Sequence, residues 1–215
     1  MTPITQTKRK PGRPSLSEKE KSEIRENIIN IARELFINEG YEHTSMRKIA
    51  SQAGFAPTKI YYYFNNKKEI LKHFWSDISI NMWRNSKPDA ATMQGDALNI
   101  IRSIMRNNID YWISNPKNYQ LLIETQDFKA SLDDNFDIYN TSGTKEYVET
   151  LMDAVGRCMQ EGVFEKDNVL FVCQLITASI YGVYGSFYSL PSIAWVDKER
   201  LIQYSIENTL RGLQV

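Results

Sequence analysis

Apolar residues recur at steps of three and four along most of this chain, which is the spacing of one buried helical face. The first stripe runs from Ile24 to Phe36, after a capping-box pattern at Ser17–Glu20 and before a helix-ending glycine at Gly40. No strand-like alternation bounded by hairpin turns occurs, and no segment repeats. The pattern therefore predicts an all-α fold.

Helical patterns continue to the carboxyl end. A second capping-box pattern at Asn66–Glu69 opens a long helix through about Asn85, which Ser86–Asp89 breaks. The remaining patterns predict helices over 98–112, 117–127, 144–161, 167–188 and 197–210, and residues 128–142 stay unassigned. The helix at 167–188 is apolar nearly all round, so it must be covered on more than one side.

The segment Thr44–Lys67 predicts a short helix, a tight turn and a second short helix. Thr44 or Ser45 caps the first helix, and Gly54 supplies the turn because glycine takes positive φ at low cost. Pro57 suits the first turn of the second helix. That helix carries Thr58, Lys59 and three consecutive tyrosines, too many polar and aromatic tips for a core. An exposed second helix after a short turn is typical of a DNA-reading helix-turn-helix.

The run GYEHTSMRKIASQAGFAPTKIYYYFNNKKEIL resembles the DNA-binding signature of TetR/AcrR-type bacterial transcription regulators. The resemblance covers roughly residues 22–72 and departs from the family at Ala56, where a Ser or Thr cap is usual, and at Lys59, where a small residue is common. It implies a three-helix DNA-binding unit at 17–66 and a larger helical domain for effector binding and dimerisation at 67–215. The matched positions are Gly40, Thr44, Ile49, Ala50, Ala53, Gly54, Ile60, Tyr61, Tyr63, Phe64, Lys67, Glu69 and Leu71.

The expected DNA contacts follow from this resemblance and from side-chain chemistry. Hydroxyls and cations suit phosphates, and we assign that role to Thr44, Ser45, Arg47 and Lys67. The major-groove edge is assigned to Thr58, Lys59 and Tyr62. Tyr61 and Tyr63 are expected to clamp the DNA backbone above a buried Phe64. The alternative for any one tyrosine is packing between helices, and Tyr61 is the strongest case for it.

Charge divides the chain into a basic front and an acidic back. Residues 1–75 carry 14 Lys/Arg against 8 Asp/Glu, and residues 76–215 carry 12 against 18. Residues 1–16 lack apolar periodicity and are expected to form a flexible basic arm. The Gly-Arg-Pro core around Arg13 resembles an AT-hook, which lays an arginine in the minor groove of A·T-rich DNA. The alternative is a solvated tail with only nonspecific attraction to phosphates.

The helices at 167–188 and 197–210 are predicted to form a homodimer interface as a four-helix bundle. The alternative is that both helices are interior to a monomer. Twofold symmetry suits a palindromic operator in double-stranded DNA, because its half-sites lie about 34–36 Å apart. The expected interface residues are Ile176, Ile180, Val183, Phe187, Ile202, Ile206 and Leu210.

Aromatic and methionine side chains gather between the DNA unit and these two helices. The family resemblance implies a small-molecule pocket here, and such a lining suits an apolar or flat aromatic effector. Ligand entry would shift the helix that begins near Lys67. The alternative is plain core. The candidate lining residues are Trp83, Tyr111, Trp112, Tyr119, Phe128, Met152 and Met159.

Other functional classes find little support in the sequence. His43 and His73 are isolated, and no metal-spaced His/Cys set, phosphate loop or nucleophile motif occurs, so we expect no enzyme, metal or cofactor. Cys158 and Cys173 are expected to be buried free thiols in a bacterial cytoplasm. The sequence contains no run of eighteen apolar residues, so we expect no membrane span. The prediction is a homodimeric repressor released from its operator by a ligand. The alternative is an architectural or non-ligand-responsive helical DNA-binding protein.

Overall fold

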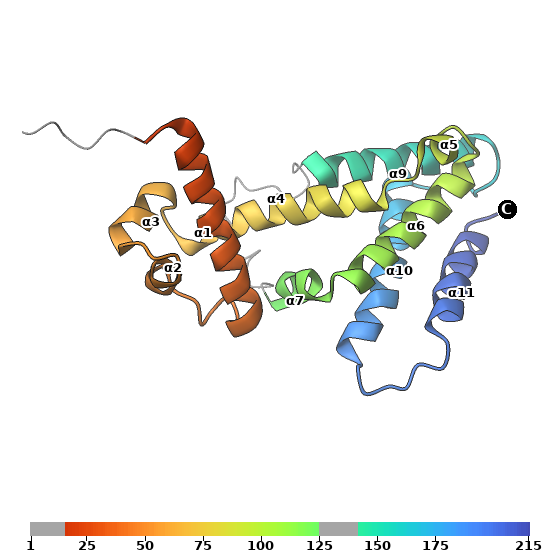
Figure 1. Ribbon diagram of the computed structural model, residues 1–215. Coiled ribbons are helices and arrows are strands. Elements are labelled where there is room, and N and C mark those ends of the chain that lie inside the picture. Colours follow the sequence, from red (N-terminus) through yellow and green to blue (C-terminus); the bar gives the residue numbers. More distant parts are fainter. Residues whose placement is uncertain (1–15, 125–141) are drawn as a thin grey trace, which may run out of the picture.

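The computed structural model describes residues 16–124 and 142–215, and these residues form an all-helical fold (Figure 1). Within them no strand occurs, and a single isolated antiparallel bridge joins Phe164 and Gln214. The all-α prediction is confirmed. The helices are α1 (Glu18–Glu39), α2 (Met46–Gln52), α3 (Pro57–Tyr63), α4 (Lys67–Ser86), α5 (Ala90–Met93), α6 (Ala97–Ser114), α7 (Pro116–Glu124), α9 (Ser142–Gln160), α10 (Val169–Ser189) and α11 (Lys198–Arg211).

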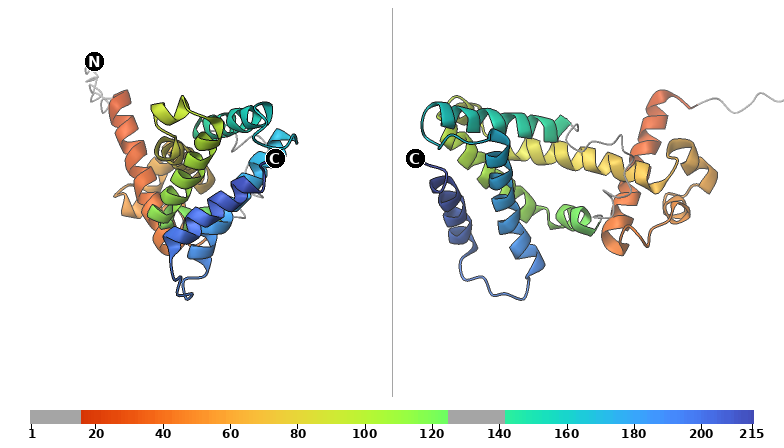
Figure 2. Two further views of the ribbon diagram at one scale, coloured as in Figure 1. Left: turned by 90° about the vertical axis from the view of Figure 1, so that its right-hand side faces the viewer. Right: turned by 180° about the vertical axis from the view of Figure 1, so that it is seen from behind.

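Helix α4 joins two parts of the molecule. The helices α1, α2 and α3 gather at its amino end, and its remaining length lies against α6 and α9 (Figures 1 and 2). Helix α10 packs on α6, α9 and α11, so α10 and α11 close the end of the molecule far from α2 and α3. Helix α7 contacts both α6 and α1. The bundle therefore reaches the first three helices through α4 and α7.

Local caps set the helix ends where the sequence predicts them. The Ser17 Oγ accepts from the Glu20 N–H (3.3 Å) and the Glu20 carboxylate accepts from the Ser17 N–H (2.8 Å), which completes the capping box of α1. Gly40 ends α1 at a φ of 87°, a conformation that only glycine adopts cheaply. Helix α5 is not predicted by the sequence pattern. It begins at Ala90 and is capped by Asp89, whose carboxylate accepts from the Thr92 N–H (2.8 Å).

The start of α4 differs in detail from the expected capping box. Asn66 caps the helix as predicted, because its side-chain oxygen accepts from the Glu69 N–H at 2.9 Å. The Glu69 carboxylate, however, accepts from the backbone N–H (2.8 Å) and side-chain amide (3.1 Å) of Asn65. The reciprocal bond therefore falls one residue earlier than the pattern predicts. It ties the chain after α3 to the first turn of α4.

Helix α10 is apolar on most of its surface and is only partly covered. By length and composition it is the one helix among the described residues that could cross a membrane, with a mean hydropathy of 1.5 over its most apolar window. No uninterrupted apolar run of eighteen residues marks it in the sequence. Its inner side packs against three helices of the same chain, whereas its outer side carries exposed apolar residues. Both predicted free cysteines are buried, and burial raises the pKa of Cys158 and of Cys173 to about 11.

Candidate nucleic-acid interface

The first turn of α2 shows which of the two candidate caps is used. The Ser45 Oγ accepts from the Lys48 N–H at 3.2 Å and caps the helix. The Thr44 hydroxyl instead donates to the Gly40 carbonyl oxygen at 3.0 Å, and Thr44 is only 2% exposed. Thr44 therefore braces the loop between α1 and α2. Its hydroxyl is directed inward, and its contact with phosphate stays a prediction.

The turn between α2 and α3 has the geometry that its residues predict. Gly54 takes a φ of 68°, and the Phe55 N–H donates to the Ala50 carbonyl oxygen at 2.9 Å, so the chain reverses within a few residues. Pro57 occupies the first turn of α3, and Ala56 leaves the helix without a side-chain cap, as expected. The turn brings α2 and α3 into contact with each other.

A continuous apolar core supports both short helices from below. Ile49 of α2, Ile60 of α3 and the adjoining Phe64 are almost completely buried against the stripe of α1 that contains Ile28 and Phe36. This confirms the buried position expected for Phe64. Since one face of α3 is fixed in this core, the opposite face must point away from the protein.

The outer face of α3 presents two of its three tyrosines. Tyr62 is 70% exposed and Tyr61 is 51% exposed, and Thr58 is exposed on the same helix. Tyr63 is half-buried, and its hydroxyl is buried with no hydrogen-bond partner among the described residues. The tyrosine that packs between helices is therefore Tyr63. The expectation that Tyr61 is the strongest case for packing is wrong.

The lysines beside this face are partly held by the protein. The Lys59 ammonium lies 3.8 Å from the centre of the Phe55 ring, so its aliphatic stem covers the turn while the charge stays at the surface. The Lys67 ammonium donates to the Tyr41 carbonyl oxygen (2.8 Å) and lies 3.6 Å from the Glu42 carboxylate. Lys67 thus anchors the loop before α2 to the start of α4. Arg47 is exposed.

This arrangement coincides with a known family. Residues 28–74 match the model described as "Bacterial regulatory proteins, tetR family". The region that contains α2 and α3 is therefore similar to the tetR family. It is 27% identical over 108 residues to the "HTH-type transcriptional regulator AcrR" of Shigella flexneri, a match that covers 50% of each chain. The chain therefore spans about half the length of this curated relative.

Solved structures extend the likeness to the rest of the fold. A TetR family transcription regulator from Marinobacter aquaeolei VT8 superposes with a TM-score of 0.67 and 14% identity, over 92% of this chain and 99% of that one. The structure named "SmeT-Triclosan complex" gives a TM-score of 0.62 and 18% identity, over 90% and 92%. At these identities the likeness concerns the fold alone. The tetR-family fold thus covers both α1–α3 and the bundle.

The apolar residues predicted at a dimer interface are used inside the chain. All except Phe187 are buried in the single chain, where α10 and α11 pack on each other and on α6, and the half-buried Phe187 packs against Trp195. Little of their surface is left for a partner subunit, and their place at an interface stays a prediction. A helix that is apolar nearly all round does not reveal which side its own chain covers. The residues concerned are Ile176, Ile180, Val183, Phe187, Ile202, Ile206 and Leu210.

The outer side of α10 and α11 carries a different set. Their apolar and aromatic side chains are between 43% and 56% exposed, and we call them the outer α10–α11 face. An open groove of about 430 Å³ lies between the two helices and is lined by Gly182, Ser186, Ser205 and Thr209 among others. The outer α10–α11 face consists of Leu170, Phe171, Leu175, Tyr181 and Tyr204.

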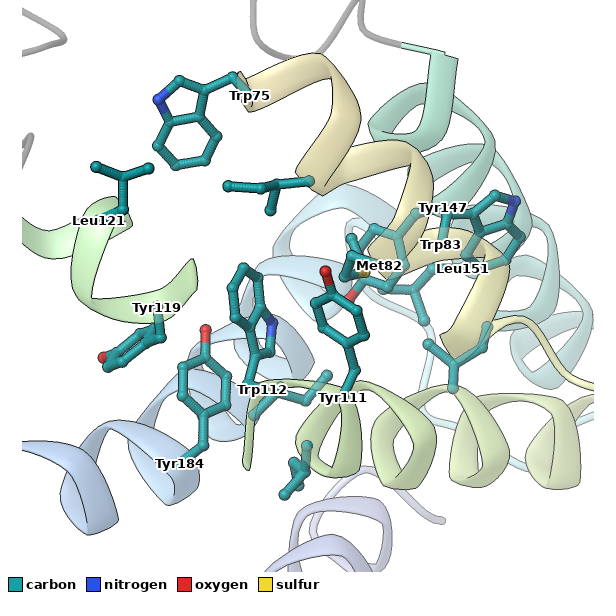
Figure 3. Packing of buried hydrophobic residues seen from close by; sticks show 14 of the residues in the cluster. Trp75, Met82, Trp83, Tyr111, Trp112, Tyr119, Leu121, Tyr147, Leu151 and Tyr184 are labelled. Carbon is teal, nitrogen blue, oxygen red and sulfur yellow. The ribbon is translucent and has the colours of Figure 1, made fainter. Parts of the chain in front are cut away.

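The candidate ligand-binding residues fall into two separate groups and do not line one common surface. Trp112 and Tyr119 meet Tyr184 of α10, with ring centres 5.7 and 4.7 Å from the Tyr184 ring (Figure 3). Trp83 lies apart, where its Nε1 donates to the Glu146 carboxylate at 2.8 Å. Met152 is 37% exposed, and its place in a pocket stays a prediction. Tyr111 and Met159 are buried, while Phe128 and Arg13 lie outside the described residues.

Sequence reasoning missed a buried polar group between α4 and α6. Asn108 is 4% exposed, and its Nδ2 donates to the Met82 sulfur at 3.3 Å. Its Oδ1 has no hydrogen-bond partner within residues 16–124 and 142–215. The signal was present, because Asn108 falls on the apolar stripe that contains Ile104 and Ile101. No group of three or more potential metal ligands occurs within the same residues.

Proposed function

We propose that the protein is a homodimeric transcriptional repressor that binds a palindromic operator through α2 and α3 and leaves it when a small molecule binds the helical bundle. The observation that carries the DNA-binding part is the outer face of α3. It presents exposed tyrosines and a hydroxyl on a helix whose other side is locked in a core. The tetR-family match covers this region. We place the boundary between the DNA unit and the effector domain at 66/67.

We assign direct base contact to Thr58, Lys59 and Tyr62. Lysine donates to guanine acceptors in the major groove, and a threonine methyl suits the thymine methyl. Tyr61 on α3, Arg47 on α2 and Ser45 at the cap of α2 would bind phosphates. Phosphate contacts fix the register of the unit without reading sequence. Lys67 is bound to its own chain, so a phosphate contact from it would use its remaining donor positions. Tyr63 supports α3 from the inside.

We infer that the outer α10–α11 face is the dimer interface. Large exposed apolar patches on a soluble protein mark surfaces that bind another molecule. The groove between α10 and α11 admits a partner helix closely at Gly182, because no atom lies within 4 Å of the position that a Cβ would take there. Twofold pairing of this face would place two copies of α3 on one duplex.

An effector site is supported by the buried aromatic groups beside α4, α6 and α10. Rings from Trp112, Tyr119 and Tyr184 suit an apolar or aromatic ligand, and the unpaired Asn108 oxygen offers an acceptor to a ligand donor. The similar fold of SmeT was solved in complex with triclosan. A ligand that wedges α6 away from α4 would change the position of α1–α3, because α4 begins among them. The DNA affinity then falls by the ligand's preference for the shifted state.

Selection of bound fragments from random DNA, followed by footprinting, tests the DNA-binding part. We expect a protected palindrome whose half-sites lie about 34–36 Å or a multiple of this apart. Uniform, weak coverage of all duplexes would support the architectural alternative instead. The ligand part is tested by titrating each bound compound into the operator complex. If no bound compound changes the operator affinity, the protein is not ligand-responsive.

A further inference from the structure

One arginine of α1 joins the end of α3 to α4. The Arg25 Nη1 donates to the carbonyl oxygen of Tyr63, the last residue of α3, at 3.3 Å. The guanidinium carbon lies 4.5 Å from the centre of the Phe64 ring. The Arg25 Nη2 is in hydrogen-bond contact with the His73 Nε2 on α4. These contacts come from three different elements, so Arg25 fixes where α3 ends relative to α1 and α4.

His73 completes the arrangement from the side of α4. Its ring meets the Phe64 ring edge to face, with centres 5.8 Å apart. Phe64 itself is buried, so the histidine and the arginine hold it between them and the core. We call the set Arg25, Phe64 and His73 the α3 joint. It lies directly behind the helix that presents Tyr61 and Tyr62 to solvent.

The α3 joint requires an uncharged histidine. Arginine has donors and no acceptor, so the His73 Nε2 must accept the bond and the ring proton must sit on Nδ1. Burial lowers the pKa of His73, and the neighbouring Arg25 charge lowers it further. The opposing charges are Glu69 and Asp77 on α4.

Both of those carboxylates already have donors. Glu69 accepts from Asn65, and Asp77 pairs with Arg33 of α1 at 3.3 Å. Neither is therefore free to turn fully toward a protonated His73. A second positive charge placed against Arg25 would repel it, and both groups would then be donors facing each other.

We propose that Arg25 and His73 are positioning residues for α3, and that protonation of His73 opens the α3 joint and weakens operator binding. This inference rests on the proposed DNA-binding function. When the joint opens, Arg25 leaves the Tyr63 carbonyl and the Phe64 ring, so the carboxyl end of α3 loses its tie to α1. The protein then becomes a regulator whose operator affinity falls in mild acid.

The sign of the effect separates this proposal from ordinary electrostatics. Adding a proton adds positive charge, which strengthens attraction to phosphates and raises affinity for any duplex. The α3 joint predicts the opposite for the operator. Because the folded-state pKa of His73 is lowered, the joint is fully stable above the ordinary His pKa of about 6.5 and is lost as the pH falls through the folded value.

The composition of the chain provides a matched control. It contains two histidines, His43 and His73, and His43 is exposed in the loop before α2. We would measure affinity for the selected operator and for random duplex from about pH 8 to about pH 5. The proteins compared are the wild type, His73→Gln and His43→Gln. A glutamine at 73 keeps a neutral acceptor for Arg25 and does not titrate in this range.

For the wild type and His43→Gln, we expect operator affinity to fall about fivefold or more toward acid, the low end of common coupling between sites. For His73→Gln we expect a flat or rising profile. The same acid loss in His73→Gln, or no loss in the wild type, would overturn the proposal. A wild type that selects no operator at pH 8 refutes the proposed function itself, which is a different result.

Nuclear magnetic resonance gives a second test that does not depend on a variant at 73. The two histidine ring signals are assigned with His43→Gln, and each pKa is measured with and without operator. If DNA holds the α3 joint closed, linkage requires the pKa of His73 to fall further in the complex. A pKa of His73 that stays constant or rises on operator binding contradicts the joint.

Discussion

In the proposed dimer, replacing Phe171 with alanine should separate the two subunits without unfolding either one. Phe171 is 55% exposed on the outer α10–α11 face. A phenylalanine side chain has about 200 Å² of surface, so the exposed part is about 110 Å², and covering it is worth about 3 kcal/mol at ~25 cal/mol per Å². In a twofold dimer the residue occurs twice. The two copies together would contribute about 6 kcal/mol to dimerisation. Because alanine keeps the Cβ and the interface relaxes around it, we expect the substitution to remove about half of this, or about 3 kcal/mol.

A loss of about 3 kcal/mol raises the dimer Kd roughly a hundredfold. Sedimentation equilibrium over a concentration series measures this Kd directly. The matched control is Ile176→Ala on the same helix, where the side chain is completely buried in its own chain. Truncating it should cost about 2–5 kcal/mol of folding stability through the cavity it leaves. Ile176→Ala should change the dimer Kd less than Phe171→Ala does.

Two results would refute this reasoning. The first is that Phe171→Ala dimerises as tightly as the wild type, which would mean that the outer α10–α11 face is not the interface. The second is that, at concentrations where both variants are monomers, Phe171→Ala loses as much folding stability as Ile176→Ala. That outcome would mean that Phe171 is covered by its own chain. The comparison at low concentration is needed because dimerisation itself stabilises the folded state.

Three further substitutions test other parts of the structure. Tyr62→Ala should weaken operator binding by about 1–3 kcal/mol and leave random-duplex binding nearly unchanged in filter-binding assays, and equal losses would make it a phosphate contact. Gly143→Ala should lower the free energy of unfolding by about 1–3 kcal/mol in chemical denaturation. The added Cβ would lie 2.3 Å from the Ser79 carbonyl oxygen and would push α9 away from α4. An unchanged free energy of unfolding would contradict this close packing. Asn66→Ala should cost about 1 kcal/mol by uncapping α4, and a neutral result would show that the Asn65–Glu69 bonds suffice.

Features that depend on neighbours in sequence were predictable. The capping box at Ser17, the positive φ of Gly54 and the cap at Asn66 involve residues within four positions, so the pattern alone identifies them. The orientation of the tyrosines was also within reach. Tyr63 lies three positions after Ile60, which places both on one side of a helix, whereas Tyr62 points elsewhere. Counting that spacing would have identified Tyr63 as the packed residue.

Features that depend on tertiary contacts were not predictable. Arg25 and His73 are 48 positions apart, and neither has a local pattern that announces the other. The same holds for α10. Its sequence is apolar on nearly every side, so only the packing of α6, α9 and α11 separates Ile176 inside from Phe171 outside. Where a helix has no polar face, periodicity gives the element but not its orientation.

The tetR-family signature in this chain describes the scaffold more than the contact surface. Of its matched positions, Thr44, Ile49 and Phe64 are buried, and Lys67 is bonded to the loop it anchors. Thr58 and Tyr62, which stand on the outer face of α3, are not among them, and Lys59 departs from the usual residue. A strong family match therefore fixes how α3 is held, while the residues proposed to read bases lie at positions that the signature leaves open. Operator preference must be sought at those three positions and not in the likeness to relatives.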